Sequence, residues 1–183
     1  MKSLKILSVT AIVVLLDQMT KIYISHSMQL HQSDRVLGDF FRITYVENAG
    51  MAFGIKVGHS GFFTIFAVIA SLAIMLYLFR MKGEKFLARF SMALILGGAI
   101  GNVGDRIIRG SVVDYLDFEF FDINIPPFQF LFIDFPGYTL NRWPVFNVAD
   151  CAITVGMLLL FIFILTEKPP TELEHLGDAE MIH

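Results

Sequence analysis

Two aspartates, Asp114 and Asp150, stand beside apolar stretches in a setting where carboxylates could do chemistry. Ionisable side chains are costly near lipid and usually have a function there. If the flanking helices are antiparallel, both carboxylates reach the same membrane surface. Carboxylates about 3 Å apart share a proton, and such a pair can activate water to attack a peptide carbonyl. Peptide hydrolysis is therefore one reading, although residue types alone favour helix capping or ion pairing.

Other polar residues are spaced so that they could support such a pair. Asp17 and Lys21 are four residues apart and share a helix face, where a neutralised ion pair is favoured over a direct chemical role. Asn147 precedes Asp150 by three residues and shares its face. A further polar stripe occupies positions i, i+3, i+4 and i+7 of one helix: Asn102, Asp105, Arg106 and Arg109. A guanidinium beside Asp105 would keep that carboxylate ionised, which suits a hydrogen-bonding scaffold better than an acid.

The elements that must position these residues are apolar helices. The chain has 183 residues, 55% of them hydrophobic and only 17% charged, and its mean hydropathy is +0.64. Soluble domains carry about a quarter charged residues, so this composition indicates a membrane protein. Four stretches are near the roughly 20 residues that cross a bilayer as a helix: Leu4–Ile24, Phe62–Phe79, Phe86–Ile108 and Phe146–Leu165. The predicted fold class is an all-α membrane protein with four transmembrane helices.

The basic residues predict the orientation of these helices. They gather at the N-terminus, as Lys2 and Lys5, and in the short turn at 80–89, and such clusters mark the cytoplasmic side. Both termini are therefore expected in the cytoplasm. The first stretch lacks the small-residue cleavage site of a secretory signal peptide, so we interpret it as a retained span. Residues 1–166 are expected to form one transmembrane domain, and the polar tail 167–183 is expected to be disordered.

The two long connections should then lie on the extracytoplasmic side. Phe40–Val46 is rich in aromatic and β-branched residues and predicts a small β element. Its backbone could pair with an extended peptide, although an ordinary surface strand fits as well. The second connection is rich in aromatic residues and is divided by Pro126-Pro127. This pattern favours a bent or hairpin-like element on the membrane surface.

Charge and cysteine content exclude several classes of protein. The formal net charge of −3 gives no reason to expect a nucleic acid partner. The single cysteine, Cys151, excludes a disulfide within the chain and a multi-thiolate metal site. The five histidines lack metal-ligand spacing.

Four segments, taken in order, resemble the signatures of the signal peptidase II family. They are Asp17-Gln-Met-Thr-Lys21, Asn48-Ala-Gly-Met-Ala-Phe-Gly54, Gly98-Ala-Ile-Gly-Asn-Val-Gly-Asp-Arg106 with its continuation Gly110-Ser-Val-Val-Asp114, and Phe146-Asn-Val-Ala-Asp150. They lie at the expected ends of the predicted helices. One such motif is modest evidence, whereas four in register are strong evidence.

The resemblance implies an aspartic endopeptidase of the bacterial cytoplasmic (inner) membrane with its active site toward the extracytoplasmic face. Its substrate would be a prolipoprotein carrying diacylglycerol on its lipobox cysteine, cut just before that cysteine. The catalytic pair carries over to Asp114 and Asp150. Supporting or substrate-binding roles carry over to Asp17, Lys21, Asn48, Gly50, Asn102, Asp105, Arg106 and Asn147. The resemblance implies no metal or organic cofactor, and it implies inhibition by the cyclic peptide antibiotic globomycin.

One departure from the family and three rival interpretations stay open. The stretch between Asp114 and Asp150 is longer than is usual for the family, and we hypothesise that its aromatic part lies on the membrane and helps to cover the lipid-bearing substrate. A small transporter could use the same polar residues, although the carboxylates cluster at one face and no internal repeat is evident. Another kind of intramembrane aspartic protease would use Asp105 as its acid. A non-catalytic membrane scaffold is the third alternative.

Overall fold

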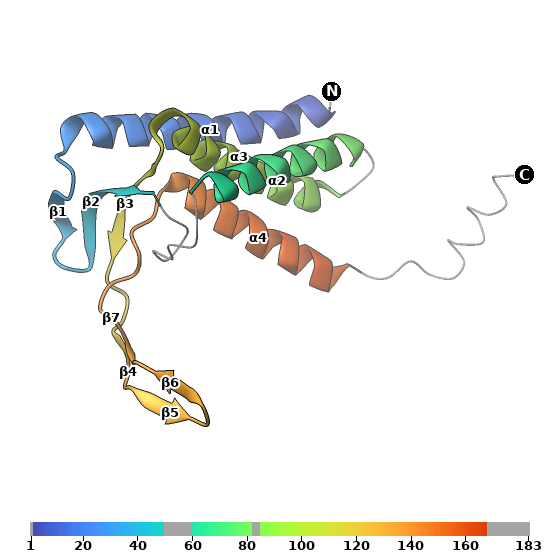
Figure 1. The fold of residues 1–183 in the computed structure, drawn as a ribbon. Coiled ribbons are helices and arrows are strands. Elements are labelled where there is room, and N and C mark those ends of the chain that lie inside the picture. The colour runs from blue at the N-terminus through green and yellow to red at the C-terminus, as the bar shows by residue number, and fades with distance from the viewer. Residues whose placement is uncertain (1, 50–59, 82–84, 168–183) are drawn as a thin grey trace, which may run out of the picture.

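Four helices and a small sheet at one end of them make up the body of the molecule (Figure 1). The structure is a computed structural model, and it describes residues 2–49, 60–81 and 85–167. The helices are α1 (Lys2–Ser27), α2 (Ser60–Arg80), α3 (Phe86–Arg109) and α4 (Val148–Thr166). Each overlaps one predicted stretch, so the four predicted helices are confirmed. Gly50 and nearly all of the polar tail expected to be disordered lie outside the described residues.

Three of the helices are long and apolar enough to cross a membrane. These segments are Ile6–Ser27 within α1, the whole of α3 and the whole of α4. In α2 the apolar segment Thr64–Arg80 is shorter, so its crossing of the bilayer stays a prediction. The molecule is thus a helical membrane protein, with three spans established by length and composition.

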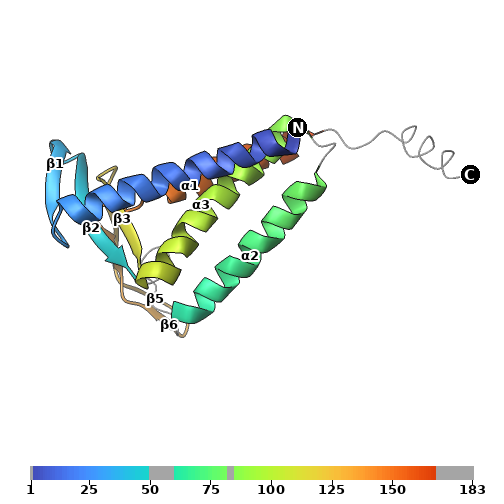
Figure 2. The ribbon, with the colours of Figure 1, turned by 90° about the horizontal axis from the view of Figure 1, so that it is seen from above.

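Helix α3 packs against all three other helices, and its glycines allow the closest of these contacts. A Cβ atom on Gly98 would lie 2.7 Å from Ile153 Cγ1 of α4, and one on Gly97 would lie 2.7 Å from Val13 Cβ of α1. Real Cβ atoms do not approach other atoms so closely, so larger residues here would push the helices apart. Small residues at helix interfaces serve this purpose in membranes. Figure 2 shows α1 and α3 lying together while α2 diverges from α1 toward one end.

An antiparallel sheet of order β1-β2-β3 lies beyond one end of the helices. Its strands are β1 (Ser33–Leu37), β2 (Phe41–Asn48) and β3 (Val112–Phe118). The predicted strand Phe40–Val46 is confirmed as β2. The suggestion that its backbone is free for a peptide is wrong for most of its length, because β1 pairs with it from Phe41 to Thr44 and β3 pairs along its other edge.

The second connection forms a long hairpin arm that leads away from the sheet (Figure 1). The strand β4 (Ile123–Ile125) pairs with β7 (Tyr138–Leu140), and β5 (Phe128–Phe130) pairs with β6 (Ile133–Phe135). Pro126-Pro127 separates the two halves, as the sequence predicted. The description as an all-α fold with one small β element therefore understated the β content, because β3 and the arm depend on pairings that local sequence does not reveal.

Side chains from α1 fix β3 above the helix ends. Tyr115 Oη donates to Thr20 Oγ1 at 2.7 Å, and Val113 is fully buried in a cluster with Ile24 and Tyr45. Because Asp114 lies between Val113 and Tyr115 on the strand, these contacts hold it near the end of the helix bundle.

Candidate active site

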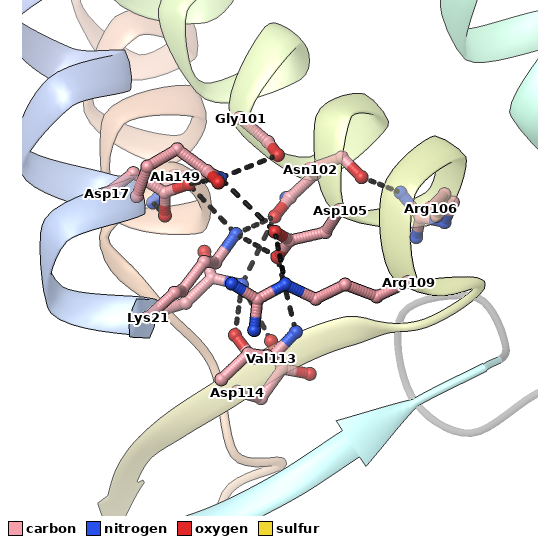
Figure 3. A network of polar contacts seen from close by, with 12 residues as sticks. Asp17, Lys21, Gly101, Asn102, Asp105, Arg106, Arg109, Val113, Asp114 and Ala149 are labelled. Carbon is pink, nitrogen blue, oxygen red and sulfur yellow. Dashed lines mark hydrogen bonds and ion pairs between the residues drawn. The ribbon is translucent and has the colours of Figure 1, made fainter. Parts of the chain in front are cut away.

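A buried ammonium group lies at the centre of the polar cluster where α1, α3 and β3 meet (Figure 3). Lys21 Nζ is 2.9 Å from both Asp17 Oδ2 and Asp105 Oδ2, and it donates to Asn102 Oδ1 at 2.9 Å. The charged side chains of this group are 0% exposed. Burying an ammonium is tolerable only when each of its three donors has a partner, and all three have one here. The predicted Asp17–Lys21 pair is confirmed, and Asp105 adds a second carboxylate to it.

Both of these aspartates also accept hydrogen bonds from backbone amides of other elements. Asp17 Oδ1 accepts from the Ala149 amide in the first turn of α4 at 3.0 Å. Asp105 Oδ2 accepts from the Val113 amide of β3 at 3.3 Å. The first amides of a helix lack partners within the helix, and a carboxylate is a favourable acceptor for them. Asp17 and Asp105 therefore tie α4 and β3 to the same buried lysine.

Arg106 is not the partner that the sequence suggested for Asp105. Its Nη1 donates to the Asn102 carbonyl at 3.4 Å, and no ion pair joins it to Asp105 among the described residues. The cation that approaches Asp105 along α3 is Arg109, at 3.8 Å. The reason is helical geometry, because neighbours in sequence point about 100° apart whereas residues four apart share a face.

Asn147 links the start of α4 to β3. Its side-chain Oδ1 accepts from the Asp150 backbone N–H at 3.0 Å, and its backbone N–H donates to Asp150 Oδ2 at 3.2 Å. The two residues therefore form a reciprocal capping box. Its Nδ2 donates to Asp114 Oδ1 at 2.6 Å and approaches Asn102 Oδ1 at 3.2 Å. One fully buried residue therefore contacts both candidate carboxylates, Asp114 through its side chain and Asp150 through its backbone amide.

A second asparagine completes the connection between the carboxylates and the buried lysine. Asn102 Nδ2 donates to Asp150 Oδ1 at 2.8 Å, while its Oδ1 receives the Lys21 ammonium. On the other side, Asn48 Nδ2 donates to Asp114 Oδ2 at 3.0 Å. Both oxygens of each carboxylate thus accept a hydrogen bond from fixed protein groups, which leaves little freedom for either side chain to rotate.

The two carboxylates differ in their surroundings. Asp114 is 3% exposed, whereas Asp150 is partly open to the surface. Burial raises the pKa of Asp114 to about 6, and the negative charge of Asp150 adds to this, while hydrogen bonds from Asn48 and Asn147 act in the opposite direction. A carboxyl with a raised pKa can keep a proton beside an ionised neighbour. This arrangement can supply an acid and a base to the same substrate.

The structure brings together all but two of the residues predicted for the site. Asp114 and Asp150 are joined through asparagines, and Asp17, Lys21 and Asp105 lie behind them. The hydrogen bond of the Arg106 side chain to the cluster is with the Asn102 backbone carbonyl, and Gly50 lies outside the described residues. No group of three His, Cys, Asp or Glu side chains with metal-ligand geometry occurs in the part of the chain that the structure describes.

Gln18 is a member of this cluster that sequence reasoning did not single out. Its Nε2 lies within hydrogen-bonding distance of Asp17 Oδ2 at 3.1 Å, Asp105 Oδ1 at 3.2 Å and the Gly101 carbonyl at 3.2 Å. A polar amide inside an apolar helix was a usable signal, because such a group needs a partner in lipid. Its position next to Asp17 hid this, since the ion pair explained the local polarity already.

Comparison with known proteins places these features in a family. The model of the family described as Signal peptidase (SPase) II matches residues 9–166. The lipoprotein signal peptidase of Halothermothrix orenii is 36% identical over 156 residues, which are 85% of this chain and 92% of that protein. The lipoprotein signal peptidase of Cupriavidus taiwanensis is 41% identical over 160 residues, which are 85% of this chain and 80% of that protein.

Solved structures give the same result at the level of the fold. A bacterial membrane enzyme determined by the in meso method at 2.3 Å is 28% identical and has a TM-score of 0.70, with 92% of this chain and 94% of that one covered. A second such enzyme, determined at 1.9 Å, is 30% identical and has a TM-score of 0.70, with 90% of this chain and 94% of that one covered.

Proposed function

Because the chain belongs to the signal peptidase II family, whose members are aspartic-type peptidases, we propose that Asp114 and Asp150 act as one catalytic pair on prolipoproteins. The protein is a membrane enzyme that cleaves the signal peptides of prolipoproteins. The observation that supports the choice of pair is Asn147, which donates to Asp114 and forms a capping box with Asp150. Other carboxylates of the cluster, Asp17 and Asp105, are occupied by Lys21 and by backbone amides.

In the proposed reaction the two carboxyl groups share one proton. The ionised member takes a proton from water as that water attacks the scissile carbonyl, and the protonated member hydrogen-bonds the carbonyl oxygen. The proton then passes to the leaving amine, and the pair returns to its starting state. The raised pKa of Asp114 favours Asp114 as the protonated member before substrate binds. Because the two groups titrate as a unit, the apparent pKa values that activity reports belong to the pair.

The supporting residues have separate tasks in this proposal. Asn48, Asn102 and Asn147 orient the two carboxylates through hydrogen bonds to defined oxygens. Lys21 orients the Asn102 side chain by donating to its Oδ1. Asp17 and Asp105 neutralise the charge of this lysine. Gly50 and Arg106 are assigned to substrate binding only by resemblance to the family.

We place the active site at the extracytoplasmic face of the bacterial cytoplasmic membrane. The described site residues lie at the end of the helices that carries the sheet, opposite the end where α2 finishes at Arg80 and α3 begins after Lys85 (Figure 1). Basic turns stay on the cytoplasmic side. A substrate lipidated on its cysteine would then approach within the outer half of the bilayer and meet the pair at the membrane edge. Cleavage just before this cysteine leaves the lipid on the product.

The pH dependence of catalysis should report the protonated member of the pair. If Asp114 must carry a proton, kcat/KM should fall about tenfold per pH unit above a pKa of about 6. Replacing Asn48 by alanine removes a hydrogen bond that favours the ionised form. The falling limb of the pH profile of kcat/KM should therefore move to higher pH in Asn48→Ala. Initial rates between about pH 4 and pH 9 measure this shift.

The matched control for this prediction is Ser33→Ala on the outer strand of the same sheet. Ser33 Oγ forms a hydrogen bond with Thr44 Oγ1 and with no candidate site residue among the described ones, so its loss should leave the limb in place. A limb that stays fixed or moves to lower pH in Asn48→Ala would contradict the assignment of Asp114.

Substrate lipidation gives the test of the proposed function. Purified enzyme in lipid should convert a diacylglyceryl-modified prolipoprotein to a product beginning at the lipidated cysteine, as read by gel shift and product mass. The same protein without diacylglycerol should remain uncut, and globomycin should block the reaction. Cleavage of the unmodified protein at an equal rate would overturn the proposed substrate class, whereas failure to cut the modified one would favour a transporter or scaffold.

A further inference from the structure

We propose that the far half of the hairpin arm, made of β5, β6 and the turn between them, is a membrane-inserted element whose apolar face is covered by lipid acyl chains. We call residues 128–135 the distal hairpin. The proposal rests on the membrane placement of the helices and on the arm itself, and it does not depend on the catalytic roles of Asp114 and Asp150.

The distal hairpin has one apolar and one polar face. Its register pairs Phe128 with Phe135 and Gln129 with Asp134. Because side chains alternate across a β-ribbon, the two phenylalanines lie on one face and the two polar residues on the other. Phe130 shares the apolar face with Phe128, and these two side chains are 64% and 54% exposed. Such a ribbon suits a boundary between lipid and water, where each face meets its own solvent.

The turn of this hairpin carries large apolar residues where water-exposed turns carry small polar ones. Leu131 adopts a φ of 56° and is 75% exposed, and Phe132 is 99% exposed. Two-residue hairpin turns normally place Gly, Asn or Asp at a residue with positive φ. Leucine at that position strains the backbone and exposes apolar surface to water. Contact between the turn and acyl chains would remove this apolar surface from water, and that gain would offset both costs.

Charge indicates which part of a membrane the distal hairpin contacts. Residues 110–141 contain no lysine or arginine, and Asp134 is the single charged residue in 123–141. Attraction to anionic headgroups requires basic residues, and none is present here. The contact is therefore hydrophobic, with aromatic rings at the level that such rings favour in membranes.

The base of the arm is fixed to the sheet by ion pairs and ring stacking. Arg142 joins the two legs of the arm by pairing with Asp117 Oδ1 at 2.8 Å and with Glu119. The Phe118 ring stacks on Phe41 of β2 at 4.5 Å between centroids. The arm is thereby continuous with the sheet at the active-site end of the helices.

The direction of the arm brings its tip toward the bilayer. It leaves the sheet sideways, away from the helix bundle, and the distal hairpin turns back toward the side on which the helices lie (Figure 1). Seen from above, β5 and β6 lie beyond the sheet in the direction of the helices (Figure 2). A segment on that side meets the same leaflet in which the active-site ends of α1, α3 and α4 are embedded. The bilayer contact of the helices therefore continues onto the distal hairpin.

Spin-label accessibility in lipid nanodiscs of neutral phosphatidylcholine tests this placement. Single cysteines would be introduced at Phe130, Phe132 and Gln129 in a Cys151→Ala background, with Leu158 of α4 as the lipid-facing reference and Asp34 of β1 as the solvated reference. Phe132 is almost fully exposed, so Phe132→Cys removes no packing contact. Cleavage of the lipidated substrate would confirm that each labelled enzyme is folded.

Labels at Phe130 and Phe132 should match the Leu158 reference, with high oxygen and low nickel-complex accessibility. The label at Gln129 should match the Asp34 reference. Nickel accessibility at Phe130 and Phe132 equal to that at Asp34 would overturn the proposal, because the tip would then lie in water. Low accessibility to both reagents would also overturn it and would indicate a protein contact in place of lipid.

Discussion

Replacing Lys21 by methionine should destabilise the folded protein by about 3–5 kcal/mol, because it removes one partner of a fully buried ion cluster. Asp17 and Asp105 would each lose a cation at 2.9 Å while remaining 0% exposed. Asn102 Oδ1 would lose its donor at 2.9 Å, so the orientation of its amide toward Asp150 would weaken as well. Equilibrium unfolding in mixed micelles, monitored by circular dichroism, measures the change in free energy.

Lys85→Met is the matched control for this prediction. Lys85 forms an ion pair with Glu167 at 3.1 Å, but its side chain is 67% exposed. Exposed pairs contribute about 0–1 kcal/mol, so this variant should unfold almost like the unmodified protein. Equal effects of Lys21→Met and Lys85→Met would contradict the role assigned to the buried cluster. The double variant Lys21→Met/Asp17→Asn should regain part of the loss, since one uncompensated charge is removed.

The parts of this cluster that sequence could predict are those set by helical spacing. Asp17 and Lys21 are four residues apart, and their ion pair at 2.9 Å follows directly from that interval. Asn102 and Asp105 share a face of α3 for the same reason, and both point to Lys21. The four helices could be predicted because long apolar runs leave the backbone no other way to satisfy its hydrogen bonds in lipid.

The parts that sequence could not predict depend on contacts between distant segments. The pairing of β3 with β2 sets Val46 against Asp114 and brings Asn48 to the carboxylate, but nothing local in either strand specifies this register. The same holds for the hydrogen bond from the Ala149 amide to Asp17, which spans 132 residues. The expected approach of Arg106 to Asp105 was wrong because adjacent residues on a helix do not share a face.

Asp114→Asn and Asp150→Asn should each lower the cleavage rate by about 10³-fold or more, since the pair provides both the acid and the base. An amide cannot accept a proton from water and cannot cycle one to the leaving amine. The substitutions keep the size of the side chains, and an amide oxygen can still accept from Asn147 at position 114 or from Asn102 at position 150. The folded state should therefore survive while the chemistry is lost.

The most direct measurement is the initial rate of cleavage of a diacylglyceryl-modified prolipoprotein by these two variants, with Asp117→Asn as the control. Asp117 lies three residues after Asp114 on β3 and is 5% exposed. Its carboxylate accepts hydrogen bonds from Thr44 and Arg142, whereas Asn48, Asn102 and Asn147 bind the candidate pair. Asp117→Asn should cut at a rate within several-fold of the unmodified enzyme, while Asp114→Asn and Asp150→Asn, still folded, should give no detectable product. If either of the latter cuts at the rate of the control, the pair is misassigned, and Asp105 becomes the next candidate for the catalytic acid.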